Sequence, residues 1–259
     1  MSRTTRSAEA SRRPDLERVR RRYDLWARLF EGQAPKRPEG AATGRHQTAG
    51  GQPETTFERW RRGLWSQAAG EVLELGVGAG ANFPHYPAGA VVTAVDLSPG
   101  MLSKAAERAD RERVPVRLIE ANVEELPFGD ASFDTVVATF VFCTVPDPHK
   151  GLAEAARVCR PGGRVLLLEH MQSPRPLAAA LIRALDPLFY LAAGDHPARR
   201  TGTFLGPAGL EVMRARDLWH GIVWEVAARP GSVRPPAPWP RWWPDGDGNG
   251  LDSDGDREG

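Results

Sequence analysis

The sequence predicts an α/β protein with a doubly wound, mostly parallel sheet of seven strands that ends in an antiparallel hairpin. Three observations support this prediction. Short apolar runs alternate with helical segments, as in parallel strands joined by right-handed crossovers. The first run leads directly into a loop with glycine at three alternate positions. The last two runs, residues 211–218 and 221–229, lie too close together for a helix between them, so we expect them to pair as a hairpin.

The individual elements follow from apolar runs and from helix start signals. The five runs that we expect to form buried strands are residues 71–75, 91–95, 116–120, 133–139 and 164–170. Ser98-Pro99 and Asp147-Pro148 each combine an N-cap with proline at the first helical position. We therefore expect one helix to end near Asp110 and the other at the Pro-Gly-Gly stop within residues 160–163.

Composition divides the rest of the chain. Residues 14–31 predict an amphipathic helix with arginines on its polar face. Its apolar face carries Leu16, Val19, Tyr23, Trp26 and Phe30. We expect this helix to cover the ligand site as a lid, and its arginine face leaves peripheral membrane contact open. We expect residues 1–13 to be a disordered basic segment, 32–56 a linker, 57–229 the folded domain, and 230–259 a disordered Pro/Trp-rich and then acidic tail.

Overall composition limits the classes of protein to which the chain can belong. It has 259 residues, of which 41% are hydrophobic, and a formal net charge of +1. This balance gives no general attraction for nucleic acid, so we expect no such partner. Cys143 and Cys159 provide no disulfide framework, and the first residues contain no apolar run typical of a secretory signal. We therefore expect a cytoplasmic protein, with its oligomeric state left open.

The acidic tail partly follows the pattern of a calcium loop. Asp245, Asp247 and Asn249 match its first positions. The twelfth position is Asp256 instead of the usual glutamate, and no helical pattern flanks the segment. We therefore expect a flexible acidic tail and no metal site, with calcium binding by this tail left open.

The stretch VLELGVGAGAN, residues 72–82, predicts the ligand site, because its strand residues run directly into a glycine loop that contains Gly76, Gly78 and Gly80. In a doubly wound sheet, ligands bind at the carboxyl ends of the strands, where this loop begins. Glycines allow a ligand to lie against the backbone. Asp96 ends the second strand, 20 residues after Gly76, and a carboxylate there typically accepts hydrogen bonds from a ribose diol. The ligand is therefore expected to contain a nucleoside, either in a dinucleotide or in an adenosyl thioether.

Two further features favour the adenosyl thioether. Glu74, two residues before Gly76, suits a ligand that carries an ammonium group. Pro84, Pro87 and Gly89 leave room for only about two helical turns after the loop, which makes a poor pyrophosphate cradle. S-adenosylmethionine has no phosphate. An NAD-dependent oxidoreductase is the less favoured alternative.

Four motifs resemble those of class I S-adenosylmethionine-dependent methyltransferases, which have a Rossmann-like fold. They are ELGVGAG, VDLSPGML, NVEELPF followed by SFDTVVA, and ARVCRPGGRVLLLEH. The resemblance extends from Tyr23 to Arg229. YDLWARLF and LPF are similar to the quinone C-methyltransferase-like branch, methyltransferase type 11. FVFCTVPDP, LLLEHMQSP and GDHPARRT are similar to bacterial phospholipid N-methyltransferases and thiol methyltransferase-like proteins. The resemblance implies methyl transfer to a small-molecule or lipid acceptor.

The resemblance also implies which residues hold the cofactor. These are Glu74, Gly76, Gly78, Gly80, Asp96, Leu97, Met101, Asn122, Val123, Thr139 and Phe140. Glu74 is expected at the amino-acid end, Asp96 at the ribose hydroxyls and Asn122 at the adenine amine. The family's usual residue at position 122 is aspartate, and asparagine keeps a carbonyl acceptor for the same amine.

Catalytic residues are harder to assign, because a sulfonium is already activated and the reaction needs mainly positioning and desolvation. His170 directly follows the fifth strand, and we consider it either a general base or a residue that shapes the pocket. Residues expected near the acceptor or lid are Tyr23, His85, Tyr86, Asp195 and Arg199. A protein that binds the cofactor without turnover is the alternative from another functional class.

Overall fold

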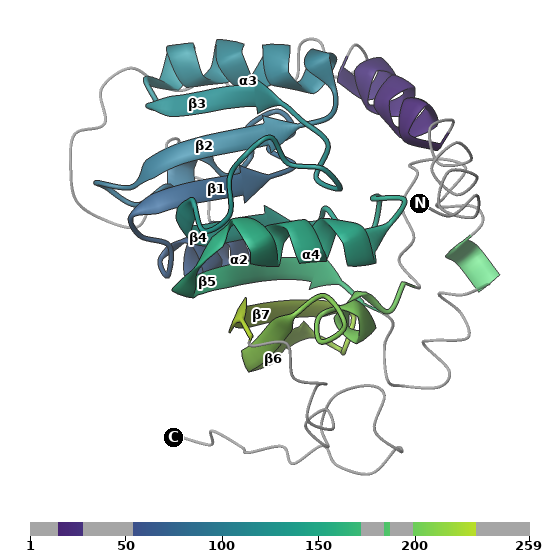
Figure 1. Cartoon of the computed structure of the whole chain (residues 1–259). Coiled ribbons are helices and arrows are strands. Elements are labelled where there is room, and N and C mark those ends of the chain that lie inside the picture. The colour runs from purple at the N-terminus through teal and green to yellow at the C-terminus, as the bar shows by residue number, and fades with distance from the viewer. Residues whose placement is uncertain (1–14, 28–53, 172–183, 187–198, 232–259) are drawn as a thin grey trace, which may run out of the picture.

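A computed structural model describes residues 15–27, 54–171, 184–186 and 199–231 of the chain (Figure 1). The predicted segment 1–13, nearly all of the linker and of the tail, and Asp195 lie outside these described residues. The strands are β1 (Glu71–Leu75), β2 (Val91–Asp96), β3 (Val116–Glu120), β4 (Phe133–Thr139), β5 (Cys159–His170), β6 (Leu210–Trp219) and β7 (Val223–Pro230). The helices are residues 15–27, α2 (Thr56–Trp65), α3 (Pro99–Glu112) and α4 (Pro148–Val158). Shorter helical segments are the 3-10 helices η1 (Phe83–His85) and η2 (Thr201–Phe204), and residues 184–186.

The seven strands form one sheet in the order β3-β2-β1-β4-β5-β7-β6. Strands β1 to β5 pair in parallel, whereas β7 pairs antiparallel with both β5 and β6. The predicted doubly wound sheet with a C-terminal hairpin is therefore confirmed. The strand order reverses between β1 and β4, which is where such sheets bind ligands.

Helices cover both faces of the sheet, with α4 in front of it and α2 behind it in the view of Figure 1. Because side chains alternate along a strand, Leu73 and Leu75 of β1 pack in the core cluster under α4. Val72 packs on the other face with Leu64 and Trp65 of α2. Glu74 is two residues after Val72 in the same strand, so its side chain lies on the same face of the sheet as α2.

Two helices differ from the sequence expectation. Helix α2 was not predicted, although Thr55 and Glu58 form a reciprocal capping box at its start. Helix α4 ends at Val158 and not within residues 160–163, because Cys159 is extended and already begins β5. Gly162, with φ of +83°, lies in the irregular first part of that strand and does not cap the helix.

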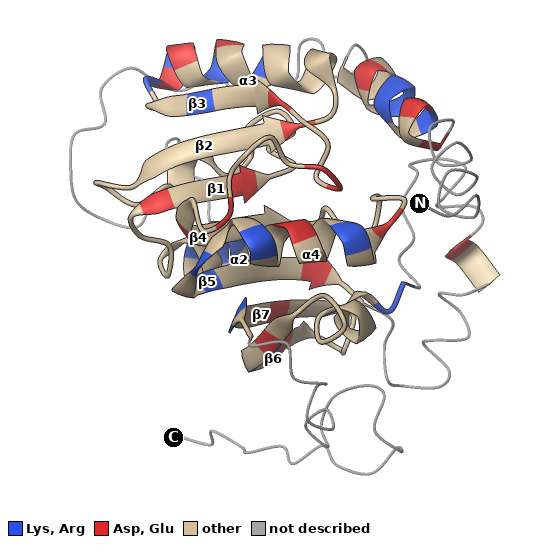
Figure 2. Ribbon diagram, viewed as in Figure 1, with Lys and Arg blue, Asp and Glu red and all other residues tan. Residues whose placement is uncertain are grey.

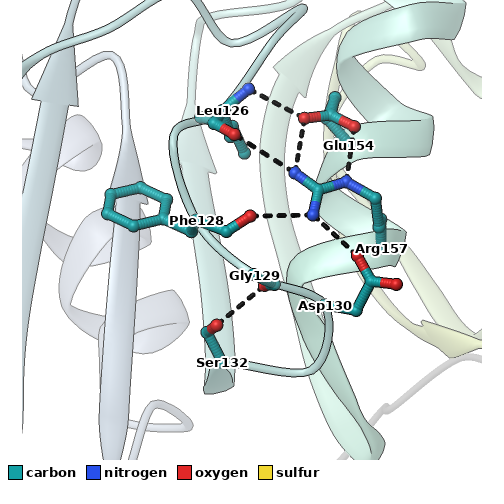
Figure 3. A network of polar contacts seen from close by, with 7 residues as sticks. All are labelled: Leu126, Phe128, Gly129, Asp130, Ser132, Glu154 and Arg157. Carbon is teal, nitrogen blue, oxygen red and sulfur yellow. Dashed lines mark hydrogen bonds and ion pairs between the residues drawn. The ribbon is translucent and has the colours of Figure 1, made fainter.

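Arg157, near the end of α4, binds the loop that joins β3 to β4 (Figure 3). Its guanidinium donates to both carboxylate oxygens of Glu154, each at 2.7 Å, and to the backbone carbonyl of Phe128 at 2.8 Å. It also pairs with Asp130 at 2.8 Å. Glu154 in turn accepts from the backbone N–H of Leu126 at 2.8 Å. These bonds raise the pKa of Arg157 and lower the pKa of Glu154. The loop that follows Asn122 and Val123 is thereby attached to α4.

Among the described residues, the helices are too short or too polar to cross a lipid bilayer.

Candidate active site

The glycine loop after β1 has three glycines with positive φ, and the space around them differs. A Cβ on Gly76 would lie 2.7 Å from Cγ2 of Val141, and one on Gly80 would lie 2.4 Å from the ring of Phe83. Both positions therefore exclude side chains through packing. A Cβ on Gly78 would meet nothing within 4 Å. Gly78, with φ of +53°, turns the backbone toward open space in which a ligand can lie.

That space is a cavity of about 270 Å³ at the carboxyl ends of the parallel strands. Its lining comes from the glycine loop, from the ends of β2, β3 and β4, and from helices 15–27 and α2. The lining residues include Leu16, Val19, Tyr23, Arg61, Gly76, Gly78, Asn82, Asp96, Leu97, Asn122, Val123, Thr139, Phe140, Val145 and Pro146. Acidic residues mark several strand ends at this edge of the sheet (Figure 2). This distribution of charge suits a cationic ligand.

Asp96 is fixed by backbone N–H groups. Its Oδ2 accepts from the N–H of Gly78 at 2.8 Å, and its Oδ1 accepts from the N–H of Ser98 at 2.9 Å. Burial raises the pKa of Asp96, and these backbone donors act against that rise. Each oxygen can accept a second hydrogen bond, so the carboxylate is oriented at the cavity wall with capacity left for hydroxyl donors.

Glu74 lies behind the cavity wall and is completely buried. Its Oε1 accepts from Nδ2 of Asn82 at 2.5 Å, and its Oε2 accepts from the hydroxyl of Tyr86. Burial raises the pKa of Glu74 to about 7, against the opposing effects of these two hydrogen bonds and of Arg61. Glu74 is not among the residues that line the cavity. The structure therefore places Asn82 and Arg61, and not Glu74 itself, at the surface that a ligand can reach.

Arg61 of α2 supplies a cation to the polar end of the cavity. Its Nη1 donates to Oδ1 of Asn82 at 2.7 Å and to Oγ1 of Thr139 at 3.1 Å. Asn82 also donates to Thr139, at 2.8 Å, so these three residues form one network with Glu74. Burial lowers the pKa of Arg61, and the nearby Glu74 carboxylate opposes that effect. The network holds a guanidinium at the cavity, where it can pair with an anionic group.

Asn122 and Val123 form the wall beyond β3, and both line the cavity together with Leu97. Oδ1 of Asn122 accepts from the backbone N–H of Glu124 at 3.0 Å, which orients its amide. Met101 is buried in the first turn of α3 and does not line the cavity.

Phe140 separates His170 from the cavity. Phe140 lines the cavity and has φ of +57°, a strained conformation for a large side chain. Its ring lies 4.5 Å from the imidazole of His170, centroid to centroid. His170 belongs to the paired part of β5, opposite Val223, and is not among the lining residues. Its contact with the site runs through the Phe140 ring.

Only some of the residues expected near the acceptor line the cavity. Tyr23 lines the cavity, whereas His85 and Tyr86 do not. Tyr86 donates to Glu74, and burial together with the nearby Arg61 lowers the pKa of His85. Arg199 donates to the backbone carbonyls of Phe142 at 2.7 Å and Val145 at 2.5 Å. It therefore fastens the loop after β4.

A family model described as a methyltransferase domain matches residues 73–167. These residues form a methyltransferase domain. The match begins in β1, contains the glycine loop, Asp96, Asn122 and Phe140, and ends within β5. The resemblance of the sequence to methyltransferases is therefore confirmed for these residues.

The methyltransferase domain also has relatives with assigned activities. A phosphatidylethanolamine N-methyltransferase from Cereibacter sphaeroides is 42% identical over 118 residues, which are 45% of this chain and 58% of that protein. A thiol S-methyltransferase from Rattus norvegicus is 40% identical over 136 residues, which are 50% of this chain and 55% of that protein. The chain thus spans less than two thirds of the length of these relatives.

The fold of the methyltransferase domain is shared with proteins of low sequence identity. The crystal structure of the [4+2]-cyclase SpnF matches with a TM-score of 0.60 at 16% identity, over 83% of this chain and 96% of that one. Because its described reaction is a cyclisation, the fold alone does not determine the chemistry.

Arg61 and Asn82 are the site residues that the sequence interpretation missed. Arg61 stands outside the domain match, among several arginines of α2, and nothing in its local pattern distinguishes it from its neighbours. Asn82 could have been found, because it directly follows the glycine loop and is polar. Both are defined by contacts with Thr139, which is distant in the sequence.

Proposed function

We propose that the chain is an S-adenosylmethionine-dependent methyltransferase that acts on a small-molecule or lipid acceptor. The observation that carries the proposal is the cavity at the strand-order switch point, with Asp96 oriented by Gly78 and Ser98 on one side and Arg61 on the other. S-adenosylmethionine supplies an activated methyl group when bound. The protein's own residues contribute binding, orientation and exclusion of water.

The residues present fit the two ends of this cofactor. Asp96 suits the ribose diol, and Asn122 with Val123 suits the adenine. Arg61 suits the carboxylate of the amino-acid end, because it is partly buried and lines the cavity. Glu74 then acts through Asn82 and Arg61, and helps to offset the cost of a buried cation.

Apolar side chains favour an acceptor with an apolar part. Leu16 and Val19 of helix 15–27 face the cavity, as do Val145 and Pro146 after β4. The names of the two relatives, one acting on phosphatidylethanolamine and one on thiols, make an amine-bearing lipid and an alkyl thiol the first acceptors to examine. Methyl transfer to either needs no catalytic metal. His170 is placed to support the Phe140 ring, so we propose that it shapes the pocket and is not a general base.

We propose further that helix 15–27 meets the membrane from which a lipid acceptor is taken. It exposes Leu25, at 55% of the residue's surface, beside arginines of its polar face. A cytoplasmic enzyme with peripheral contact to anionic lipid would fit this surface.

A methyl-transfer assay tests the proposal. S-adenosylmethionine with a radioactive methyl group is incubated with the full chain and either phosphatidylethanolamine vesicles or an alkyl thiol. We expect label in one acceptor, and no transfer by the Asp96→Ala variant. Cofactor binding without transfer to either class would favour the alternative, a cofactor-binding protein without turnover on these acceptors. Absence of cofactor binding would contradict the proposal itself.

A further inference from the structure

Helix 15–27 forms one wall of the cavity although it is distant in sequence from the methyltransferase domain. Leu16, Val19 and Tyr23 provide that wall. Figure 1 shows this helix, in purple, beside the N-terminal end of α3. The contacts of this helix with α3 hold that wall of the cavity in place.

Asp24 makes the principal polar attachment. Its Oδ1 accepts from the hydroxyl of Ser98 at 2.5 Å and from the backbone N–H of Gly100 at 3.1 Å. Ser98 is the N-cap of α3, so the carboxylate lies at the end of the helix where backbone N–H groups point outward and negative charge is stabilised. A second attachment, Arg20 to Glu120 at 3.4 Å, has both side chains more than 40% exposed and contributes little.

Gly100 allows helix 15–27 to approach α3 this closely. A Cβ at this position would lie 3.1 Å from Oδ1 of Asp24, 3.2 Å from Cβ of Ala27 and 3.3 Å from Cα of Asp24. Gly100 lies in the first turn of α3 and has no positive φ. Alanine is favoured over glycine within a helix, so the lack of a side chain here is explained by the docked helix and not by α3 itself.

The attachment of Asp24 is linked to the residue that we assign to the ribose. Ser98 donates its hydroxyl to Asp24 and its backbone N–H to Oδ1 of Asp96 at 2.9 Å. One residue thus orients both carboxylates. A ligand held by Asp96 lies against the same turn that holds helix 15–27.

We propose that Asp24 is a positioning residue, which closes helix 15–27 over the cavity through Ser98 and Gly100 and thereby slows release of the bound cofactor. The proposal rests on the proposed function and adds the residue that controls retention. It assigns no chemical step to Asp24.

Release of S-adenosylhomocysteine from the full chain provides the test, measured by stopped flow after mixing with excess S-adenosylmethionine. Asp24→Ala removes the acceptor, and Gly100→Ala places a methyl group against the docked helix. We expect each to accelerate release about ten-fold, as for loss of hydrogen bonds to a charged group. Asp24→Asn retains an oxygen acceptor and should fall between wild type and Asp24→Ala. The matched control is Asp15→Ala, which removes an exposed carboxylate from the same helix.

Hydrogen exchange of residues 15–27 in the complex identifies the cause. Faster exchange in Asp24→Ala and Gly100→Ala, together with faster release and unchanged Asp15→Ala, would support the proposal. Faster exchange without faster release would overturn it, because the helix would then dock without retaining the cofactor. Unchanged exchange and release would overturn it as well. Failure of the wild-type chain to bind either cofactor form would instead overturn the proposed function.

Discussion

At the scale of single residues, the polar end of the cavity depends on a buried carboxylate that no ligand can touch. Glu74 has no exposed surface, and Asn82 and Tyr86 donate to its two oxygens. Asn82 also donates to Thr139, and both residues accept hydrogen bonds from Arg61. The sequence indicated that a carboxylate before the glycine loop serves the ligand. Its indirect action could not be predicted, because it depends on an arginine from another element.

We predict that Arg61→Ala weakens binding of S-adenosylmethionine by roughly ten- to a hundred-fold, since a hydrogen bond to a charged group contributes about 1.5–3 kcal/mol. Adenosine has no carboxylate, so its affinity should change little. Titration calorimetry with both ligands measures the difference. Arg59→Ala is the control, because Arg59 belongs to the same helix and its side chain is 63% exposed. Equal losses for both ligands would show that the variant had damaged the whole cavity.

A second residue-scale prediction concerns pH. The pKa of Glu74 is raised from 4.5 to about 7 by burial, so the folded cofactor-free chain binds this proton more tightly than the unfolded chain does. The free energy of unfolding should therefore fall as pH rises from about 4.5 to about 7, and this contribution should level off above that range. Glu74→Gln cannot titrate. Urea denaturation at pH 5 and pH 8 should show a loss for wild type that exceeds the loss for the variant by on the order of 2–3 kcal/mol. Parallel losses in the two proteins would contradict this assignment.

At the scale of elements, helix α4 and the loop after β3 support the side of the cavity that we assign to adenine. Arg157 joins Glu154 of the helix to loop carbonyls, and Glu154 binds a loop N–H (Figure 3). The start of α4 was predictable from Asp147-Pro148, and the structure shows the expected cap. Asp147 accepts a hydrogen bond from the backbone N–H of Lys150 at 3.1 Å. Its end was not, because the glycines after Cys159 belong to the irregular start of β5. The same glycines would suit a helix stop, so local pattern alone could not decide.

We predict that Arg157→Ala lowers the free energy of unfolding by about 1–3 kcal/mol, because it leaves Glu154 and two loop carbonyls without a cationic partner. Urea denaturation measures this change. Arg111→Ala is the matched control on a different helix, since the Arg111 side chain is 47% exposed and its distance to Glu112 is 3.6 Å. Equal effects of the two substitutions would mean that the loop attachment adds no stability.

At the scale of the whole molecule, the sheet was predictable and the closed cavity was not. Strand lengths, the glycine loop and the short hairpin connection are local features, and together they indicate a doubly wound sheet. The cavity is assembled from segments far apart in the chain, such as helix 15–27 against Ser98 and Gly100, and α2 against Thr139. Such contacts between distant segments depend on how the elements pack at the edge of the sheet. They cannot be read from spacing in one sequence.

The most direct test of the proposed cofactor site is calorimetric titration of the full chain with S-adenosylmethionine, S-adenosylhomocysteine and NAD in parallel. We predict binding of the first two ligands, loss of both in Asp96→Ala, and no binding of NAD. Circular dichroism of the variant verifies that the sheet is intact. Binding of NAD alone, or binding of S-adenosylmethionine that is unchanged in Asp96→Ala, would contradict the assignment of this cavity.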